Sequence, residues 1–172
     1  MTSRVRTAFP SRAALSCAIA VGIVGPSSAA EIVHHPLMGG STFPIARAVE
    51  VPAGKTIYFH SGTTPAPANP QATAGTSEYW GDTKTQTLSV FARIKESLDT
   101  LGLGFGDVVS MTVYLVGDSA KGGKMDFEGF MGAYTQFFGT KEQPNLPARS
   151  TVQVAGLAGA GMLVEIEVQL AK

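Results

Sequence analysis

The sequence has little cysteine and little charge, and both shortages restrict what the protein can be. Cys17 is the only cysteine among 172 residues, which excludes an intrachain disulfide. Charged residues make up 15% of the chain, and the formal net charge is zero. Residues 31–172 carry ten basic and thirteen acidic side chains without a basic run. We therefore expect no nucleic-acid partner, because binding to a phosphate backbone requires clustered positive charge.

The residue spacings of common metal and cofactor sites are also missing. The three histidines, His34, His35 and His60, form neither a His-Glu-x-x-His pattern nor another ligand spacing. The glycines within residues 102–106 follow an expected helix rather than opening one, unlike a dinucleotide-binding loop. We expect no metal and no cofactor.

The first thirty residues have the pattern of a secretory signal peptide. Three arginines and no acidic residue precede an uncharged stretch at 13–24, and small residues stand before a cut after Ala30. The uncharged stretch is shorter than the roughly 20 residues that a membrane-spanning helix needs. We expect residues 1–30 to be removed, leaving a single domain at 31–172 that is periplasmic or secreted and has no membrane anchor.

Hydrophobic periodicity in residues 31–172 predicts an α+β domain. Apolar residues that recur every three or four positions indicate helices from Asp82 or Thr83 to Leu101 and over 126–138, and both helices should cover one face of a single sheet. A proline-rich stretch over 62–81 predicts a long loop. The expected strands cover 46–51, 56–61, 108–116, 149–155 and 162–170, with a weaker one at 32–36; turn residues at 52–55 and 156–161 suggest two hairpins.

The last two expected strands alternate between apolar and polar residues. With the apolar side chains under the helices, the opposite face would carry Arg149, Thr151, Gln153, Glu165, Glu167 and Gln169. One interpretation is a solvated face on which Arg149 and a glutamate form a cross-strand ion pair. The other is that a second subunit covers this face and places an arginine and a glutamate in a cleft.

Four segments carry a resemblance to a known family. NLPARSTVQV at 145–154, followed by VEIE at 164–167, resembles the C-terminal signature of the reactive-intermediate deaminase family (Rid, also called YjgF or endoribonuclease L-PSP). GDVVSMTVYL at 106–115 and FMGAYTQFF at 130–138 resemble its middle strand and second helix, and YFHSG at 58–62 resembles a strand that ends in Ser-Gly. The similarity extends over residues 43–171.

The resemblance implies a chorismate-mutase-like α+β fold, with two helices on one face of a single sheet, and a homotrimer with clefts at the subunit interfaces. The implied activity is hydrolysis of 2-imino or 2-enamino acids, such as 2-iminobutanoate and 2-iminopropanoate, to a 2-keto acid and ammonia. Arg149 would bind the substrate carboxylate through two hydrogen bonds. Glu165 would position water and transfer protons. Ser61, Gly62 and Thr151 would complete the substrate-binding site, Gly62 through its backbone N–H group.

The chain departs from the family pattern at several points. Ile45 stands where the family has a cleft tyrosine, Thr151 replaces a cysteine of many deaminases, and the loop after Gly62 is longer. A ligand-binding or chaperone-like protein without turnover is therefore an alternative, and ribonuclease activity is a third that the charge balance disfavours. His60 shares a strand face with Tyr58, and either lines the cleft or has a core or edge role.

Overall fold

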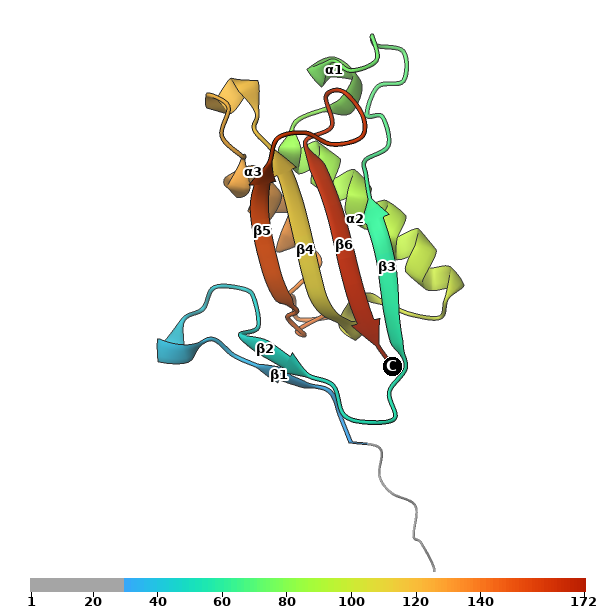
Figure 1. Ribbon diagram of the computed structural model, residues 1–172, viewed down its shortest axis with the longest axis vertical. Coiled ribbons are helices and arrows are strands. Elements are labelled where there is room, and N and C mark those ends of the chain that lie inside the picture. Colours follow the sequence, from blue (N-terminus) through green and yellow to red (C-terminus); the bar gives the residue numbers. More distant parts are fainter. Residues whose placement is uncertain (1–29) are drawn as a thin grey trace, which may run out of the picture.

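The computed structural model describes residues 30–172 as one sheet with two long helices behind it and a small strand pair beside it (Figure 1). The expected signal peptide lies almost wholly outside the described residues, so its cleavage after Ala30 stays a prediction. The elements are β1 Val33–His35, η1 Met38–Gly40, β2 Ala48–Glu50, β3 Ile57–Thr63, α1 Ser77–Trp80, α2 Thr83–Thr100, η2 Phe105–Asp107, β4 Val108–Val116, η3 Ser119–Lys121, α3 Phe127–Tyr134, β5 Ala148–Val154 and β6 Val164–Ala171.

Four strands form the main sheet in the order β3-β6-β4-β5. β6 runs antiparallel to both of its neighbours, whereas β4 and β5 are parallel. The parallel pair follows from the connection through α3, because a strand-helix-strand crossover returns the chain in the same direction. The strand pair β1–β2 forms a separate sheet at the end of the domain.

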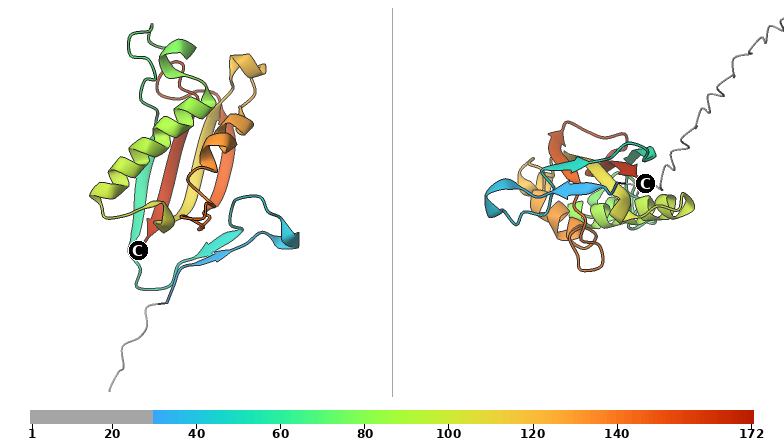
Figure 2. Two further views of the ribbon diagram at one scale, coloured as in Figure 1. Left: turned by 180° about the vertical axis from the view of Figure 1, so that it is seen from behind. Right: turned by 90° about the horizontal axis from the view of Figure 1, so that it is seen from below.

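Both α2 and α3 lie on one face of the main sheet, as the periodicity predicted (Figure 2). Asp82 caps α2 by accepting a hydrogen bond from the Thr85 N–H group, and the chain leaves the helix through Gly102 at a φ of 68°. α3 is shorter than expected and ends at Tyr134. The core between helices and sheet is built from fully buried side chains, the largest being Tyr134, Phe91, Phe130, Phe138, Ile94 and Leu98.

Neither of the two expected hairpins forms. β2 pairs with β1 and β3 pairs with β6, so residues 52–55 connect two different sheets. β4 lies between β5 and β6, so residues 156–161 cross over the end of β4 instead of joining neighbouring strands. The physical reason is that β6 has a fully buried apolar side and is most stable at the centre of the sheet. Turn residues indicate where the chain changes direction, but they do not determine which strands pair.

The prediction that Arg149 lies on the face of the sheet opposite the helices is also wrong. In the parallel register Arg149 lies opposite Met111 and Thr151 lies opposite Val113, and both of these β4 residues point into the core under the helices. Arg149 and Thr151 therefore lie on the helix side, while Val152 of β5 faces the other way and is 44% exposed. β5 is an edge strand, and its burial does not follow the alternation that holds for the central strand β6.

Candidate functional site

Glu165 and Gly62 lie against each other on the face of the main sheet that the helices leave open. Between His60 and Thr63 the pairing of β3 with β6 contains one extra residue, which is a β-bulge. The side-chain oxygen Oε1 of Glu165 occupies the space where a Cβ atom on residue 62 would stand. A larger residue at position 62 would displace this carboxylate from its position. The preceding residue, Ser61, lines a hollow together with Glu167.

A second carboxylate on the open face has a fixed partner. The hydroxyl group of Tyr114, on β4, donates a hydrogen bond of 3.0 Å to Oε2 of Glu167. This bond raises the pKa of the Tyr114 hydroxyl above its ordinary value. Glu165 and Glu167 share one strand face, but Glu165 lies beside Gly62, whereas Glu167 is held by a tyrosine.

Arg149, on the helix side, is surrounded by aromatic rings. Its guanidinium carbon lies 4.2 Å from the ring centre of Tyr134, 5.0 Å from Phe130 and 5.6 Å from Phe43. Phe127 completes this aromatic cage at 6.0 Å and stacks on Phe43. Aromatic faces attract a guanidinium cation without using its hydrogen-bond donors.

The guanidinium N–H groups of Arg149 therefore do not all have hydrogen-bond acceptors. Nη2 contacts the sulfur of Met131 at 3.3 Å, while Nη1 is buried and has no hydrogen-bond partner among the described residues. Thr151 Oγ1, two residues further along the same strand face, is likewise buried without such a partner. Burial lowers the pKa of Arg149, although an arginine remains charged at neutral pH.

Tyr134 gives the cage a fixed wall. Its hydroxyl group donates a 2.9 Å hydrogen bond to the carbonyl oxygen of Pro44, and burial raises its pKa to about 12. The neutral hydroxyl therefore ties α3 to the segment that carries Phe43. This bond positions Phe43 over Arg149.

The expected site residues thus form two groups on opposite faces of one sheet. Ser61, Gly62 and Glu165 belong to the open face, and Arg149 and Thr151 belong to the helix side. His60 joins neither group, because its ring turns toward α2 and contacts Ser97. A small molecule cannot contact both groups within a single copy of the chain.

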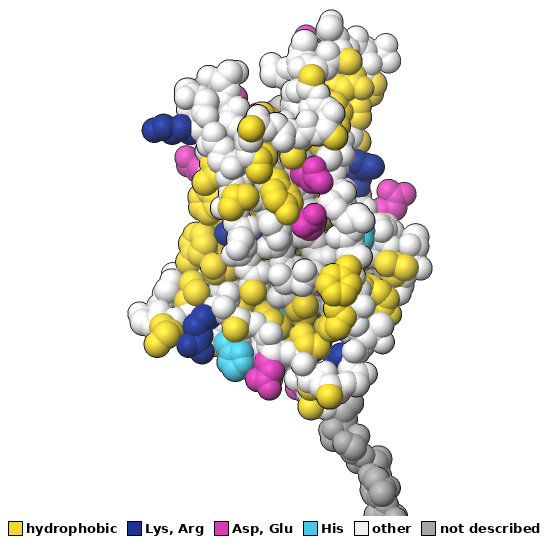
Figure 3. Space-filling model, viewed as in Figure 1, with side chains coloured by type: hydrophobic (Ala, Val, Ile, Leu, Met, Phe, Trp, Pro, Cys, Tyr) yellow, Lys and Arg dark blue, Asp and Glu magenta, His cyan; other side chains and the backbone are white. Residues whose placement is uncertain are grey.

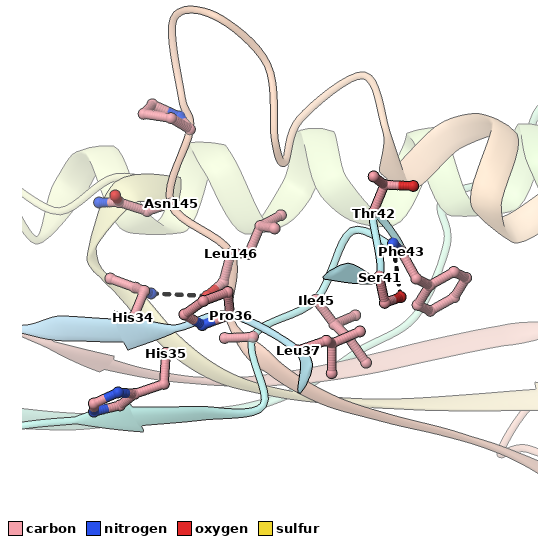
Figure 4. A pocket seen from close by; sticks show the side chains of 12 residues that line it. His34, His35, Pro36, Leu37, Ser41, Thr42, Phe43, Ile45, Asn145 and Leu146 are labelled. Atoms are coloured by element: carbon pink, nitrogen blue, oxygen red, sulfur yellow. Dashed lines mark hydrogen bonds between the residues drawn. The ribbon is translucent and has the colours of Figure 1, made fainter. Parts of the chain in front are cut away.

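A pocket of about 210 Å³ lies between β1 with the segment that follows it and the loop that precedes β5 (Figure 4). The His34 ring, in the wall of this pocket, donates a 2.7 Å hydrogen bond from Nδ1 to the Leu146 carbonyl oxygen. Phe43 belongs both to this pocket and to the cage. Ile45, which stands in place of the family tyrosine, also lines the pocket.

The open face mixes carboxylates with uncovered apolar side chains (Figure 3). Phe59 is 78% exposed and Ile57 is 42% exposed, and both lie on the same side of β3 as Ser61. Val152 adds a further exposed apolar side chain at the opposite edge of the sheet. Such a surface is typical of a face that contacts another protein chain.

Residues 30–172 contain no group of three or more histidine, cysteine, aspartate or glutamate side chains that could hold a metal ion. No helix in this part of the chain is long and apolar enough to cross a membrane.

Residues 41–171 match the family described as Endoribonuclease L-PSP. This chain belongs to that family. Among curated relatives, a RutC family protein of Haemophilus influenzae is 28% identical over 74% of this chain and 86% of its own. A RutC family protein of Pyrococcus horikoshii is 36% identical, and the match spans 51% of this chain and 60% of that protein.

Solved structures of the family have the same α+β fold. A Yersinia pestis protein of the Rid family is 25% identical with a TM-score of 0.60, and the match covers 83% of this chain and 98% of that one. Escherichia coli TdcF, solved with bound serine, is 30% identical with a TM-score of 0.52, and the match covers 77% and 91% of the two chains.

The sequence did not reveal the aromatic cage. Phe127, Phe130 and Tyr134 have the spacing of a helix face that packs into a core, and Phe43 is far from them in the chain. One sequence feature points toward the cage: Phe127 and Phe130 stand three residues apart on the expected second helix, and a strand containing Arg149 follows that helix. The structure adds that this helix packs beside the strand, with Phe130 fully buried.

Proposed function

We propose that this member of the Endoribonuclease L-PSP family is a deaminase that hydrolyses 2-imino and 2-enamino acids, with 2-iminobutanoate and 2-iminopropanoate as representative substrates. The products are a 2-keto acid and ammonia. The observation that supports this most is the half-buried Arg149, whose Nη1 atom lacks a partner and whose charge is surrounded by aromatic rings. The three ion pairs of the described residues do not involve Arg149, so its charge is available to a ligand carboxylate.

The second part of the proposal is that the site forms between two copies in a homotrimer. One copy supplies Arg149 and Thr151, and the neighbouring copy supplies Ser61, Gly62 and Glu165. The arrangement on opposite faces of the sheet supports this, because one substrate can contact both groups only across a contact between subunits. The exposed apolar side chains of the open face supply a surface for that contact.

The chemistry assigns a role to each residue. Arg149 binds the carboxylate of the imino acid, and the Thr151 hydroxyl group donates a hydrogen bond to the ligand. Glu165 accepts a proton from water as the water oxygen bonds to the imine carbon. This proton passes to the imine nitrogen, which gives a carbinolamine. Glu165 then transfers the hydroxyl proton of the carbinolamine to the nitrogen, the carbon–nitrogen bond breaks, and ammonia leaves while the hydroxyl oxygen becomes the oxygen of the ketone. The backbone of Gly62 keeps Glu165 and the substrate close, since no side chain intervenes.

The binding of serine by TdcF supports a ligand of amino-acid size with a carboxylate. The bound serine is equally consistent with the alternative, in which this protein binds such ligands without converting them. Turnover of an imino acid produced in the assay distinguishes the two.

We expect Arg149→Lys and Glu165→Gln each to lower imine hydrolysis by about ten- to a hundredfold, because each removes a charge-assisted contact or the base. Glu167→Gln is the matched control on the same strand face, and we expect a much smaller effect because Glu167 pairs with Tyr114. The measurement is ammonia release from an imino acid that an amino-acid oxidase generates in the assay.

Mixed trimers test whether the site is shared. Arg149→Lys and Glu165→Gln subunits are co-expressed with different tags, and trimers that carry both tags are isolated. In every trimer that carries both tags, one of the three interfaces combines an intact Arg149 with an intact Glu165, so about one third of the wild-type activity should return. No recovery in mixed trimers would refute the shared site, and no hydrolysis by the wild type would refute the deaminase.

A further inference from the structure

His60 and Ser97 form a polar pair outside the proposed deaminase site. His60 belongs to β3 and Ser97 to α2, which crosses behind β3 (Figure 2). Ser97 Oγ lies 3.0 Å from His60 Nε2, and His60 Nδ1 lies 2.9 Å from the carbonyl oxygen of Ser61. The pair lies on the helix side of β3, whereas Gly62 contacts Glu165 on the open face.

The hydrogen bonds determine which nitrogen of His60 is protonated. A carbonyl oxygen can only accept a hydrogen bond, so Nδ1 must donate to Ser61. In the neutral ring Nε2 is then unprotonated and accepts a hydrogen bond from the Ser97 hydroxyl group. A serine hydroxyl, a histidine that accepts its proton and a third group that orients the histidine are the elements of an activated nucleophile.

A hollow of about 330 Å³ opens at this pair. Arg93, one helical turn before Ser97, lies in its wall and donates a hydrogen bond to the Thr64 carbonyl oxygen. That bond orients the guanidinium and uses one of the five N–H donors that an arginine carries. Arg93 thereby brings a positive charge to the wall of the hollow, which Glu96 also lines, and this charge would attract an anionic oxygen that develops during attack by Ser97.

We propose that Ser97 is a nucleophile that accepts an acyl group from a small carboxylic ester, with His60 as its base. The hollow is at the lower end of the size of small-molecule sites, which favours short acyl groups. As Oγ bonds to the ester carbonyl carbon, Nε2 takes the hydroxyl proton. The ester carbon–oxygen bond then breaks, and the proton moves from Nε2 to the departing alcohol. Water releases the carboxylic acid from Ser97 in a second step of the same kind.

The reaction needs no group that the protein does not supply, apart from the ester and water. It is also independent of the trimer, because His60, Arg93 and Ser97 come from a single chain. Loss of imine hydrolysis and loss of ester cleavage should therefore be separable by mutation.

The experiment uses the whole protein and p-nitrophenyl acetate, with release of p-nitrophenolate followed by absorbance and the acetylated peptide identified by mass spectrometry. We expect an initial burst of at most one p-nitrophenolate per chain, and protein quenched in acid during this burst should carry its acetyl group on Ser97. Ser97→Ala should abolish this acetylation, and His60→Gln should slow it at least tenfold, since an amide can hold the hydrogen bond but cannot take the proton. Ser97→Cys, which retains a nucleophile beside His60, should still be acetylated.

Ser89→Ala is the matched control. Ser89 lies on α2 two turns before Ser97, and its Oγ accepts a 2.9 Å hydrogen bond from the Ala66 N–H group instead of facing a histidine. This variant should be acetylated like the wild type, and imine hydrolysis should remain unchanged in Ser97→Ala. Acetylation confined to lysines, or equal acetylation of the His60→Gln variant, would overturn the proposal.

Discussion

Arg149 illustrates how a single residue can keep a charge available inside a protein. Cation–π contacts contribute about 0.5–2 kcal/mol each, and more when the site excludes water. Four aromatic rings around the guanidinium therefore offset part of the cost of its burial without supplying a negative charge. An aspartate in the same place would compensate the charge and compete with a ligand carboxylate.

Gly62 offers a test of the contact with Glu165. In Gly62→Ala the new methyl group must displace the Glu165 carboxylate, which is the flexible end of a side chain, so the fold should survive with a small loss of stability. Imine hydrolysis should fall at least tenfold, because the base leaves its position. Thermal unfolding and the ammonia assay measure the two effects.

The double variant Gly62→Ala with Glu165→Gln is the control for this prediction. If Gly62→Ala acts through Glu165, it should have little further effect on turnover once the base is absent. Additive losses would show that Gly62 acts through its own backbone, and unchanged turnover in the single variant would show that the contact has no role in the reaction.

At the level of elements, one side chain joins two loops at the end of the sheet. Gln86, fully buried on α2, accepts a 2.7 Å hydrogen bond from the Leu163 N–H group and donates to the carbonyl oxygens of Gly81 and Gly161. Trp80 adds a 2.8 Å hydrogen bond from its indole to Ala160. The long loop after Gly62 is thus attached to the loop before β6, and β6 carries Glu165.

Gln86→Leu should destabilise the protein by about 2–4 kcal/mol, because leucine has a similar size but removes three partly buried hydrogen bonds to backbone groups, which contribute about 0.5–1.5 kcal/mol each. Urea unfolding is the measurement. Gln136→Leu is the control. The Gln136 side chain is exposed, and among the described residues it bonds only to the carbonyl oxygen of Gly132, one helical turn earlier. The free energy of unfolding of this variant should stay within about 0.5 kcal/mol of the wild-type value. Equal stability of the Gln86 variant and the wild type would show that the three bonds contribute nothing.

At the level of the whole molecule, the proposed trimer would use the open face of the sheet as its subunit contact. Phe59→Lys places a charge in the centre of the proposed subunit contact, and burying it there would be unfavourable. We expect wild-type residues 31–172 to form a trimer and the variant to be a monomer at micromolar concentration, as measured by light scattering.

Leu101→Lys is the control for this assembly prediction, because Leu101 is also exposed but lies at the end of α2, away from the open face. It should leave the trimer intact. A wild-type monomer, or a Phe59→Lys trimer of unchanged stability, would contradict the assignment of this face to assembly.

The sequence by itself determined the class of fold, the two helices and most strand positions, because these depend on local periodicity. The repeat of Leu88, Phe91, Ile94 and Leu98 is a property of neighbouring residues, and so is the capping aspartate at position 82. The segments that resemble the family likewise identified its membership, which the match over residues 41–171 confirms.

Only the tertiary structure decided which strands are neighbours and which way Arg149 faces. Strand pairing depends on contacts between residues far apart in the chain, and turn chemistry at 156–161 cannot report that β4 lies between β5 and β6. Alternation assigns two faces to a strand, but which face is covered depends on the helices packed against it. On the edge strand β5 the helix α3 covers the polar side, and that single fact places Arg149 and Glu165 on opposite faces of the sheet.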